Sequence, residues 1–135
     1  MLTPRYRLIT EEGFSLEIVN RKDAAPFITK DASEIREILS PRNSSIKKQS
    51  LAEARVLPGK STEEHIHPKT EEIYYVLRGR GRIRIDDEER DICPGDGIAI
   101  MPGSRHKVWN TGDVDLVFLC CCVPAYTHED TIITE

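Results

Sequence analysis

The sequence has no long hydrophobic run and no excess of positive charge, and these two absences exclude several classes of protein. No apolar stretch approaches the roughly 20 residues that a membrane-spanning helix needs, so we expect no membrane partner. The formal net charge is −4, which gives no electrostatic basis for binding nucleic acid. The N-terminal segment lacks an apolar run followed by a small-residue cleavage site, so we expect no signal peptide.

Cysteine is scarce, with four residues in total: Cys93 and the contiguous run Cys120, Cys121 and Cys122. Contiguous cysteines in a strand point to alternate faces and are poorly placed to bridge one another. This pattern favours free thiols in a reducing compartment, and we predict a cytoplasmic protein. No second pair completes a zinc-ribbon pattern. We interpret these cysteines as small hydrophobic side chains in a β-core.

The residues that are present indicate one globular domain preceded by an arm. The chain has 135 residues, of which 39% are hydrophobic and 31% charged, a balance typical of a single packed domain. Residues 1–49 predict an N-terminal arm with one short helix at 31–40. Asp31 can cap this helix and Pro41 can end it. Its apolar positions share one helical face: Ile35, Ile38 and Leu39.

From residue 50 onward the pattern changes to short strands. The segments EEIYYVLRG (71–79), RIRI (82–85) and VDLVFLCCCV (114–123) are rich in β-branched and aromatic residues or alternate strictly. Turn residues separate such segments about every 8–12 positions, which is typical of an all-β sandwich or barrel. We therefore predict a β-barrel over residues 50–124 and a polar C-terminal tail over 125–135.

Two histidines that are two residues apart open the most informative stretch. In a strand, His65 and His67 share one face with Cα atoms about 6.6 Å apart, so both imidazoles can reach one ion. Glu72 lies five residues after His67, but a turn at Pro68-Lys69-Thr70 would let the next strand aim it back at the histidines. A full metal site needs a further ligand, and His106 lies in a second cluster of strand and turn residues.

These residues carry a resemblance to the cupins. The first cupin motif is matched in type and spacing by Gly59, His65, His67, Glu72 and Gly79, and the second is resembled by Gly95, Pro102, Gly103, His106 and Asn110. At one position the sequence departs from the motif, because Met101 stands where a proline is expected. The two motifs span residues 59–110, and the flanking strands extend the resemblance to about 50–124.

The resemblance implies a double-stranded β-helix, a small jelly roll of two antiparallel sheets with a metal at its mouth. The ligands that it implies are His65, His67, Glu72 and His106. This donor set suits one divalent Fe, Mn, Ni, Co or Zn ion, and affinity alone does not choose among them. The implied function is a metal-dependent enzyme acting on a small carboxylate, sugar or diketone as a dioxygenase, decarboxylase, isomerase or lyase. The alternative is a non-catalytic metal-containing module that binds or senses a small molecule.

Further residues are candidates for the pocket. Tyr74 shares strand parity with Glu72, so it can hydrogen-bond a ligand or donate a proton, or it can be a core aromatic. Glu53 and Arg55 would suit an acidic substrate if they point inward. Cys120 and Cys122 share a face that can look toward the cavity, although nothing adjacent in sequence would lower a thiol pKa.

The expected partners are a small-molecule ligand and a second copy of the chain. The open edges of the predicted sheets and the long N-terminal arm suggest a homodimer in which arms or edge strands are exchanged.

Overall fold

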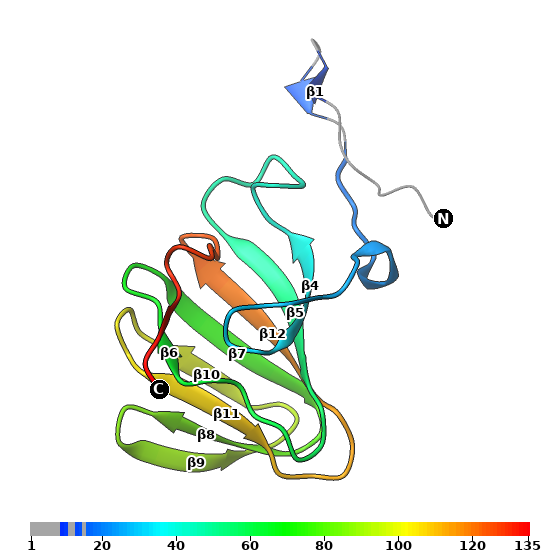
Figure 1. Cartoon of the computed structure of the whole chain (residues 1–135). Helices are drawn as coiled ribbons and strands as arrows, with labels where there is room; N and C mark the ends of the chain where they lie inside the picture. The colour runs from blue at the N-terminus through cyan, green and yellow to red at the C-terminus, as the bar shows by residue number, and fades with distance from the viewer. Residues whose placement is uncertain (1–8, 11–12, 15) are drawn as a thin grey trace.

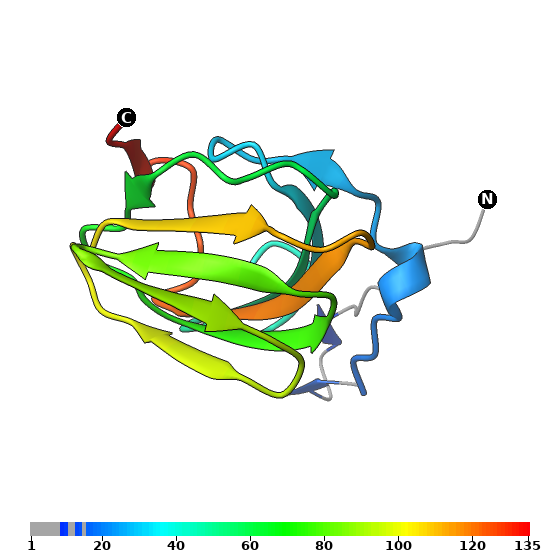
Figure 2. The same cartoon turned by 90° about the horizontal axis from the view of Figure 1, so that it is seen from below.

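The computed structural model describes residues 9–10, 13–14 and 16–135, and its main strands form two antiparallel sheets that face each other (Figure 1 and Figure 2). The six-stranded sheet has the order β10 (Gly97–Ile100), β7 (Glu71–Arg78), β12 (Leu116–Val123), β5 (Ser50–Val56), β4 (Glu34–Leu39) and β3 (Phe27–Ile28). The five-stranded sheet has the order β13 (Ile132–Ile133), β6 (His65–Ile66), β11 (His106–Asn110), β8 (Gly81–Ile85) and β9 (Glu88–Ile92). A separate hairpin pairs β1 (Ile9–Thr10) with β2 (Gly13–Phe14), and a short 3-10 helix, η1, spans Arg21–Asp23.

The space between the two sheets is filled by side chains that alternate along the strands. In β7, Tyr74 and Val76 are buried while their neighbours Tyr75 and Leu77 are exposed. The same alternation in β12 buries Phe118, whose side chain is among the largest that are fully enclosed. A strand with one buried and one solvated face has this period of two. The fold is therefore the predicted all-β double-stranded β-helix.

The predicted helix at 31–40 is wrong, because most of this segment is the strand β4. Its backbone pairs with β5, for example Ile35 with Ala54. A helix of two to three turns is marginal in isolation, whereas the edge of β5 offers a full set of hydrogen-bond partners. The ladder shifts register between Glu37 and Leu39.

Segments on both sides of the predicted barrel join its sheets. The hairpin of β3 and β4 extends the six-stranded sheet beyond β5, and β13 pairs with β6 in the other sheet. The segment before the predicted barrel therefore lies beside β5, and the segment after it lies beside β6, the strand that contains His65.

No helix among the described residues is long and apolar enough to cross a membrane.

The homodimer stays a prediction. The outward face of β7 leaves Ile73, Tyr75 and Leu77 exposed by 54%, 45% and 44%.

Candidate metal centre

Four side chains from both sheets converge at one end of the barrel. His65 and His106 begin β6 and β11 and are directly opposed in the register of the two strands. His67 follows β6, and Glu72 reaches the cluster from β7 in the facing sheet. One ligand atom from each histidine lies within 4.8 Å of the others. All four side chains are buried, with exposures between 1% and 5%. The structure thus brings together every ligand that the motifs implied.

The turn after His67 directs Glu72 back toward the histidines. The carboxylate of Asp130 accepts hydrogen bonds from the backbone N–H groups of Lys69 (3.2 Å) and Thr70 (3.1 Å), which fixes this turn. The backbone N–H of Gly103 donates to the carbonyl of His67 at 2.9 Å. The second motif therefore keeps its contact with the first although Met101 replaces the expected proline.

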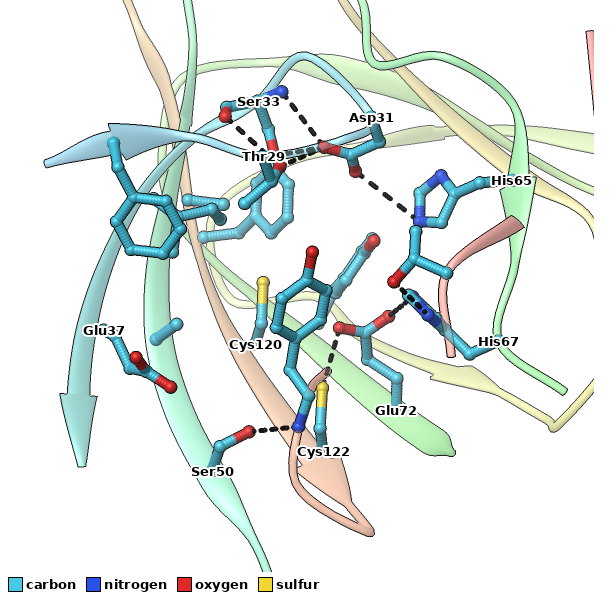
Figure 3. Close-up of a pocket in the computed structure, with 18 residues that line it drawn as sticks. Thr29, Asp31, Ser33, Glu37, Ser50, His65, His67, Glu72, Cys120 and Cys122 are labelled. Atoms are coloured by element: carbon cyan, nitrogen blue, oxygen red, sulfur yellow. Dashed lines mark hydrogen bonds and ion pairs between the residues drawn. The ribbon is translucent and has the colours of Figure 1, made fainter. Parts of the chain in front are cut away.

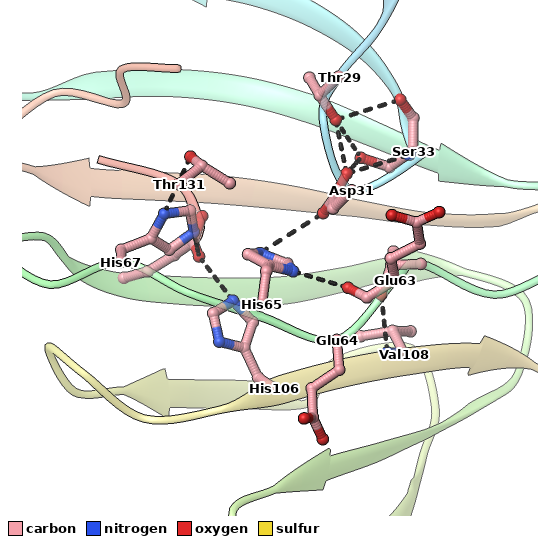
Figure 4. Close-up of polar contacts among 12 residues, drawn as sticks. Thr29, Asp31, Ser33, Glu63, Glu64, His65, His67, His106, Val108 and Thr131 are labelled. Atoms are coloured by element: carbon pink, nitrogen blue, oxygen red, sulfur yellow. Dashed lines mark hydrogen bonds and ion pairs between the residues drawn. The ribbon is translucent and has the colours of Figure 1, made fainter. Parts of the chain in front are cut away.

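Backbone carbonyls orient all three imidazole rings, and Figure 4 shows this contact for His65 and Glu63. The Nδ1 atoms of His65, His67 and His106 face the carbonyl oxygens of Glu63 (2.8 Å), Asp130 (3.2 Å) and Ser104 (3.0 Å), respectively. A carbonyl oxygen can only accept, so each Nδ1 carries the donated proton. In a neutral ring the lone pair is then on Nε2, and this outer hydrogen bond is the usual partner of a metal-binding histidine.

With the protons on Nδ1, the Nε2 nitrogens and the Glu72 oxygen that point into the cluster are all hydrogen-bond acceptors, so they cannot hydrogen-bond to one another. Nε2 of His67 and Nε2 of His106 lie 3.4 and 3.6 Å from the same oxygen, Oε1 of Glu72. Within the described part of the chain, Glu72 Oε1 and His106 Nε2 are buried atoms without a hydrogen-bond partner. Buried polar atoms in native proteins are nearly always satisfied. A cation between these lone pairs would satisfy them, so the residues fit a metal ion with nitrogen and carboxylate ligands.

The pKa shifts of Glu72 and His65 fit the same arrangement; at His67, burial is outweighed by the nearby Glu72, which raises the pKa of that imidazole. Burial opposes ionisation of Glu72, but the adjacent His106 and His67 imidazoles outweigh it and lower the pKa of Glu72 to about 2. Burial lowers the pKa of His65 to about 4, and nearby His106 adds to this effect. At neutral pH, Glu72 is therefore a carboxylate and His65 a neutral imidazole, which are the forms that bind metals.

His65, His67 and Glu72 form one wall of a small cavity between the sheets (Figure 3). Its volume is about 40 Å³, which is room for about three water molecules. Phe27, Thr29, Glu37 and Tyr126 line both this cavity and an outer groove of about 590 Å³. The part of a ligand that reaches the histidines must therefore be small, whereas a larger part has space outside.

Tyr74 lines the cavity, and its ring centroid lies 4.6 Å from that of Phe118 and 6.0 Å from that of His106. Burial, reinforced by the charge of Glu72, raises the pKa of Tyr74 well above its ordinary value. The phenol therefore stays protonated and can act as a hydrogen-bond donor in the cavity.

Glu53 and Arg55 do not line the cavity, and their prediction as substrate contacts is wrong. The strand β5 presents Ala52 and Ala54 to the cavity, so Glu53 and Arg55, which alternate with them, point to the opposite face. There Glu53 accepts a hydrogen bond from Arg21 at 2.6 Å. Arg55 pairs with Glu34 on the neighbouring strand. Alanines inside and charges outside are the ordinary pattern of a strand with one solvated face.

Cys120 and Cys122 face the cavity, as their shared parity suggested. The thiol of Cys122 donates a hydrogen bond to Glu72 Oε2 at 3.1 Å. Burial and the negative charge of Glu72 raise the pKa of both thiols. The two cysteines are thus neutral groups beside the cluster, and a raised pKa opposes a nucleophilic role.

We expect iodoacetamide at pH 8 to modify Cys93, which is exposed, and to leave Cys120 and Cys122 unmodified in the folded protein. Thiolate is the reactive form, and the two buried thiols are both inaccessible and protonated. Peptide mass spectrometry before and after denaturation measures this, with all four cysteines labelled in the denatured sample. Labelling of Cys120 or Cys122 at the rate of Cys93 would contradict the assignment.

Sequence reasoning missed several residues around the cluster. Asp31, from the turn between β3 and β4, places Oδ2 3.5 Å from His65 Nε2. The C-terminal segment supplies the carbonyl of Asp130, and Thr131 Oγ1 lies 3.3 Å from His67 Nδ1. A backbone carbonyl has no signature in sequence, and Asp31 lies outside both motifs. The only available signal for Asp31 was its polar neighbourhood, Thr29 and Ser33.

Comparison with known proteins agrees with the fold. Residues 52–122 match the cupin domain family. An uncharacterized protein of Methanocaldococcus jannaschii is 51% identical over 110 residues, which cover 82% of this chain and 88% of that protein. An oxalate-binding protein of Thermotoga maritima is 32% identical over 90 residues, which cover 67% of this chain and 74% of that protein.

A solved structure shows the same architecture. The crystal structure of a predicted oxalate decarboxylase from Thermotoga maritima matches with a TM-score of 0.71 and 28% sequence identity, and the match covers 79% of this chain and 98% of that chain. The family match spans most of the barrel, including the three histidines and Glu72. The chain belongs to the cupin domain family.

Proposed function

We propose that the protein binds one divalent transition metal through His65, His67, Glu72 and His106, and that it is a metal-dependent enzyme acting on a small carboxylate. The observation that carries this proposal is the pair Glu72 Oε1 and His106 Nε2, which are buried without hydrogen-bond partners in the described chain, with His67 Nε2 at 3.4 Å from the same oxygen. Three imidazoles and one carboxylate suit Fe, Mn, Ni, Co or Zn. When bound, such an ion supplies a Lewis acid that polarises a ligand oxygen.

The charges of the cavity indicate how a carboxylate substrate would have to bind. The residues that line it, among those the structure describes, include no lysine or arginine. An anionic ligand would therefore depend on the metal for charge compensation, since burying an uncompensated carboxylate is costly. The volume of about 40 Å³ beside the histidines favours a ligand head of few atoms. Oxalate, named for the Thermotoga maritima relative, is the first ligand to test.

In this proposal the protein side chains have separate tasks. The carbonyl-anchored imidazoles and Glu72 hold the ion, and Tyr74 donates a hydrogen bond from its protonated hydroxyl to a ligand oxygen. Phe118 and the alanines of β5 make the rest of the wall apolar and keep the cavity small. Water exclusion strengthens each electrostatic contact within such a site.

We expect oxalate to bind the metal-loaded protein and not the metal-free protein in isothermal titration calorimetry. An enzyme of the decarboxylase class would then convert each hydrogen oxalate into one carbon dioxide and one formate, which NMR detects. Tyr74→Phe is the matched variant, because it removes the hydroxyl alone and should weaken binding about 10-fold. Equal oxalate affinity of the metal-free and metal-loaded proteins would contradict the proposal.

The second candidate is a non-catalytic binding module, which the description of the Thermotoga maritima relative as an oxalate-binding protein favours. The same experiment separates the two candidates. Metal-dependent binding without formate supports the binding module, and formate that accumulates beyond one equivalent per chain supports the enzyme.

A further inference from the structure

Asp31 brings a second carboxylate to the histidine cluster from outside the barrel motifs (Figure 4). It lies in the turn between β3 and β4, which belongs to the segment that precedes β5. Its side chain lines the same cavity as His65, His67 and Glu72, and the residue is only 8% exposed. A buried carboxylate needs compensation by hydrogen bonds or by a cation.

One oxygen of Asp31 is fully anchored. Oδ1 accepts hydrogen bonds from the hydroxyl of Thr29 (2.5 Å) and from both the hydroxyl (2.6 Å) and the backbone N–H (3.0 Å) of Ser33. The residue between, Ala32, adopts the left-handed φ of 74° that closes this tight turn. These contacts fix the orientation of the carboxylate and leave Oδ2 directed at His65.

The free oxygen meets an imidazole nitrogen that has no proton to donate. His65 donates from Nδ1 to the carbonyl of Glu63 at 2.8 Å, so its Nε2 lone pair faces Asp31 Oδ2 at 3.5 Å. This separation resembles the 3.4 and 3.6 Å between Glu72 Oε1 and the other two Nε2 atoms. The Asp31–His65 pair therefore has the same acceptor-to-acceptor geometry as the ligands that the motif implies, and one cation would compensate both.

We propose that Asp31 is a fifth protein ligand of the metal, a role that the two cupin motifs do not include. The inference rests on the proposed metal site. With Asp31 and Glu72 both bound, two carboxylates balance the charge of a divalent ion. An incoming carboxylate adds negative charge next to Asp31 and competes with it for the metal. Asp31 thus strengthens metal binding and weakens binding of anionic ligands.

Asp31→Asn tests this inference, because asparagine keeps the size and the anchored oxygen while it removes the charge. We expect its affinity for Co²⁺ to fall at least about 10-fold, as much as loss of an outer hydrogen-bond partner of a metal ligand costs. The visible absorption of bound Co²⁺, which depends on the ligand set, should change as well. Oxalate should bind the Co²⁺-saturated variant more tightly than it binds the Co²⁺-saturated wild-type protein.

Glu37→Gln is the matched control. Glu37 lines the same cavity but pairs with Arg42, and it lies on the far side from the histidines (Figure 3). We expect this variant to match wild type in Co²⁺ affinity and spectrum. If Asp31→Asn also matches wild type, Asp31 is not a ligand and the four-residue metal site stands alone. If the wild-type protein binds no Co²⁺, the metal site itself is wrong, and the inference fails with it.

Discussion

Replacing Glu72 with glutamine is expected to lower the affinity for a divalent metal by more than about 100-fold. This exceeds the roughly 10- to 100-fold loss that is usual when a metal ligand loses its hydrogen-bond partner. Glu72 Oε1 lies 3.4 and 3.6 Å from two histidine nitrogens and is the one atom that faces both of them. Glutamine fills the same space but has no charge to neutralise the ion. Competition with a chromophoric chelator measures the affinity.

Glu71→Gln is the control for this substitution. Glu71 precedes Glu72 on β7 and is exposed on the opposite face. It has the same chemistry but no access to the cluster, so its variant should bind metal as wild type does. Near-ultraviolet circular dichroism should show that both variants are folded. Equal metal affinity of the Glu71 and Glu72 variants would remove Glu72 from the ligand set.

Replacing Gly79 with alanine is expected to destabilise the fold by about 2–5 kcal/mol. Gly79 has a φ of +86°, and a Cβ atom there would lie 2.5 Å from the carbonyl oxygen of Asp115 and 2.9 Å from the Cα of Leu116. Both contacts are with the backbone that leads into β12, so no side-chain rotation relieves them. Urea unfolding followed by fluorescence measures the change in free energy of unfolding.

Gly59→Ala separates backbone strain from steric overlap. Gly59 also has a positive φ, +75°, but a Cβ atom there would meet nothing within 4 Å. We therefore expect only the cost of the left-handed conformation, about 1–2 kcal/mol. The same loss of stability at both glycines would show that the contact with Asp115 and Leu116 is relieved by movement of the chain.

The convergence of the four candidate ligands could be predicted from sequence because the motif encodes their local geometry. His65 and His67 share a face by strand parity, and the turn before Glu72 reverses its direction. His106 then meets His65 because antiparallel pairing of β6 and β11 aligns them. The alternation in β7 and β12 likewise identified the inner and outer faces, including the orientation of Cys120 and Cys122.

What escaped prediction depends on contacts between distant segments. The spacing of Ile35 and Ile38 suits a helix as well as a strand with a shifted register, and only the edge of β5 decides between them. The parity of Glu53 and Arg55 could not be fixed because no motif residue lies in β5. Asp31 and the Asp130 carbonyl reach the cluster through tertiary packing of the segments on either side of the motifs.

Elemental analysis of the full chain purified without chelators tests the central claim most directly, with a His106→Ala variant prepared in parallel. The account predicts about one transition-metal ion per chain in the wild-type protein and its loss in the variant, while both remain folded. Metal-free wild-type protein, even after incubation with Mn²⁺, Fe²⁺, Co²⁺, Ni²⁺ or Zn²⁺, would contradict the claim that these four side chains form a metal centre.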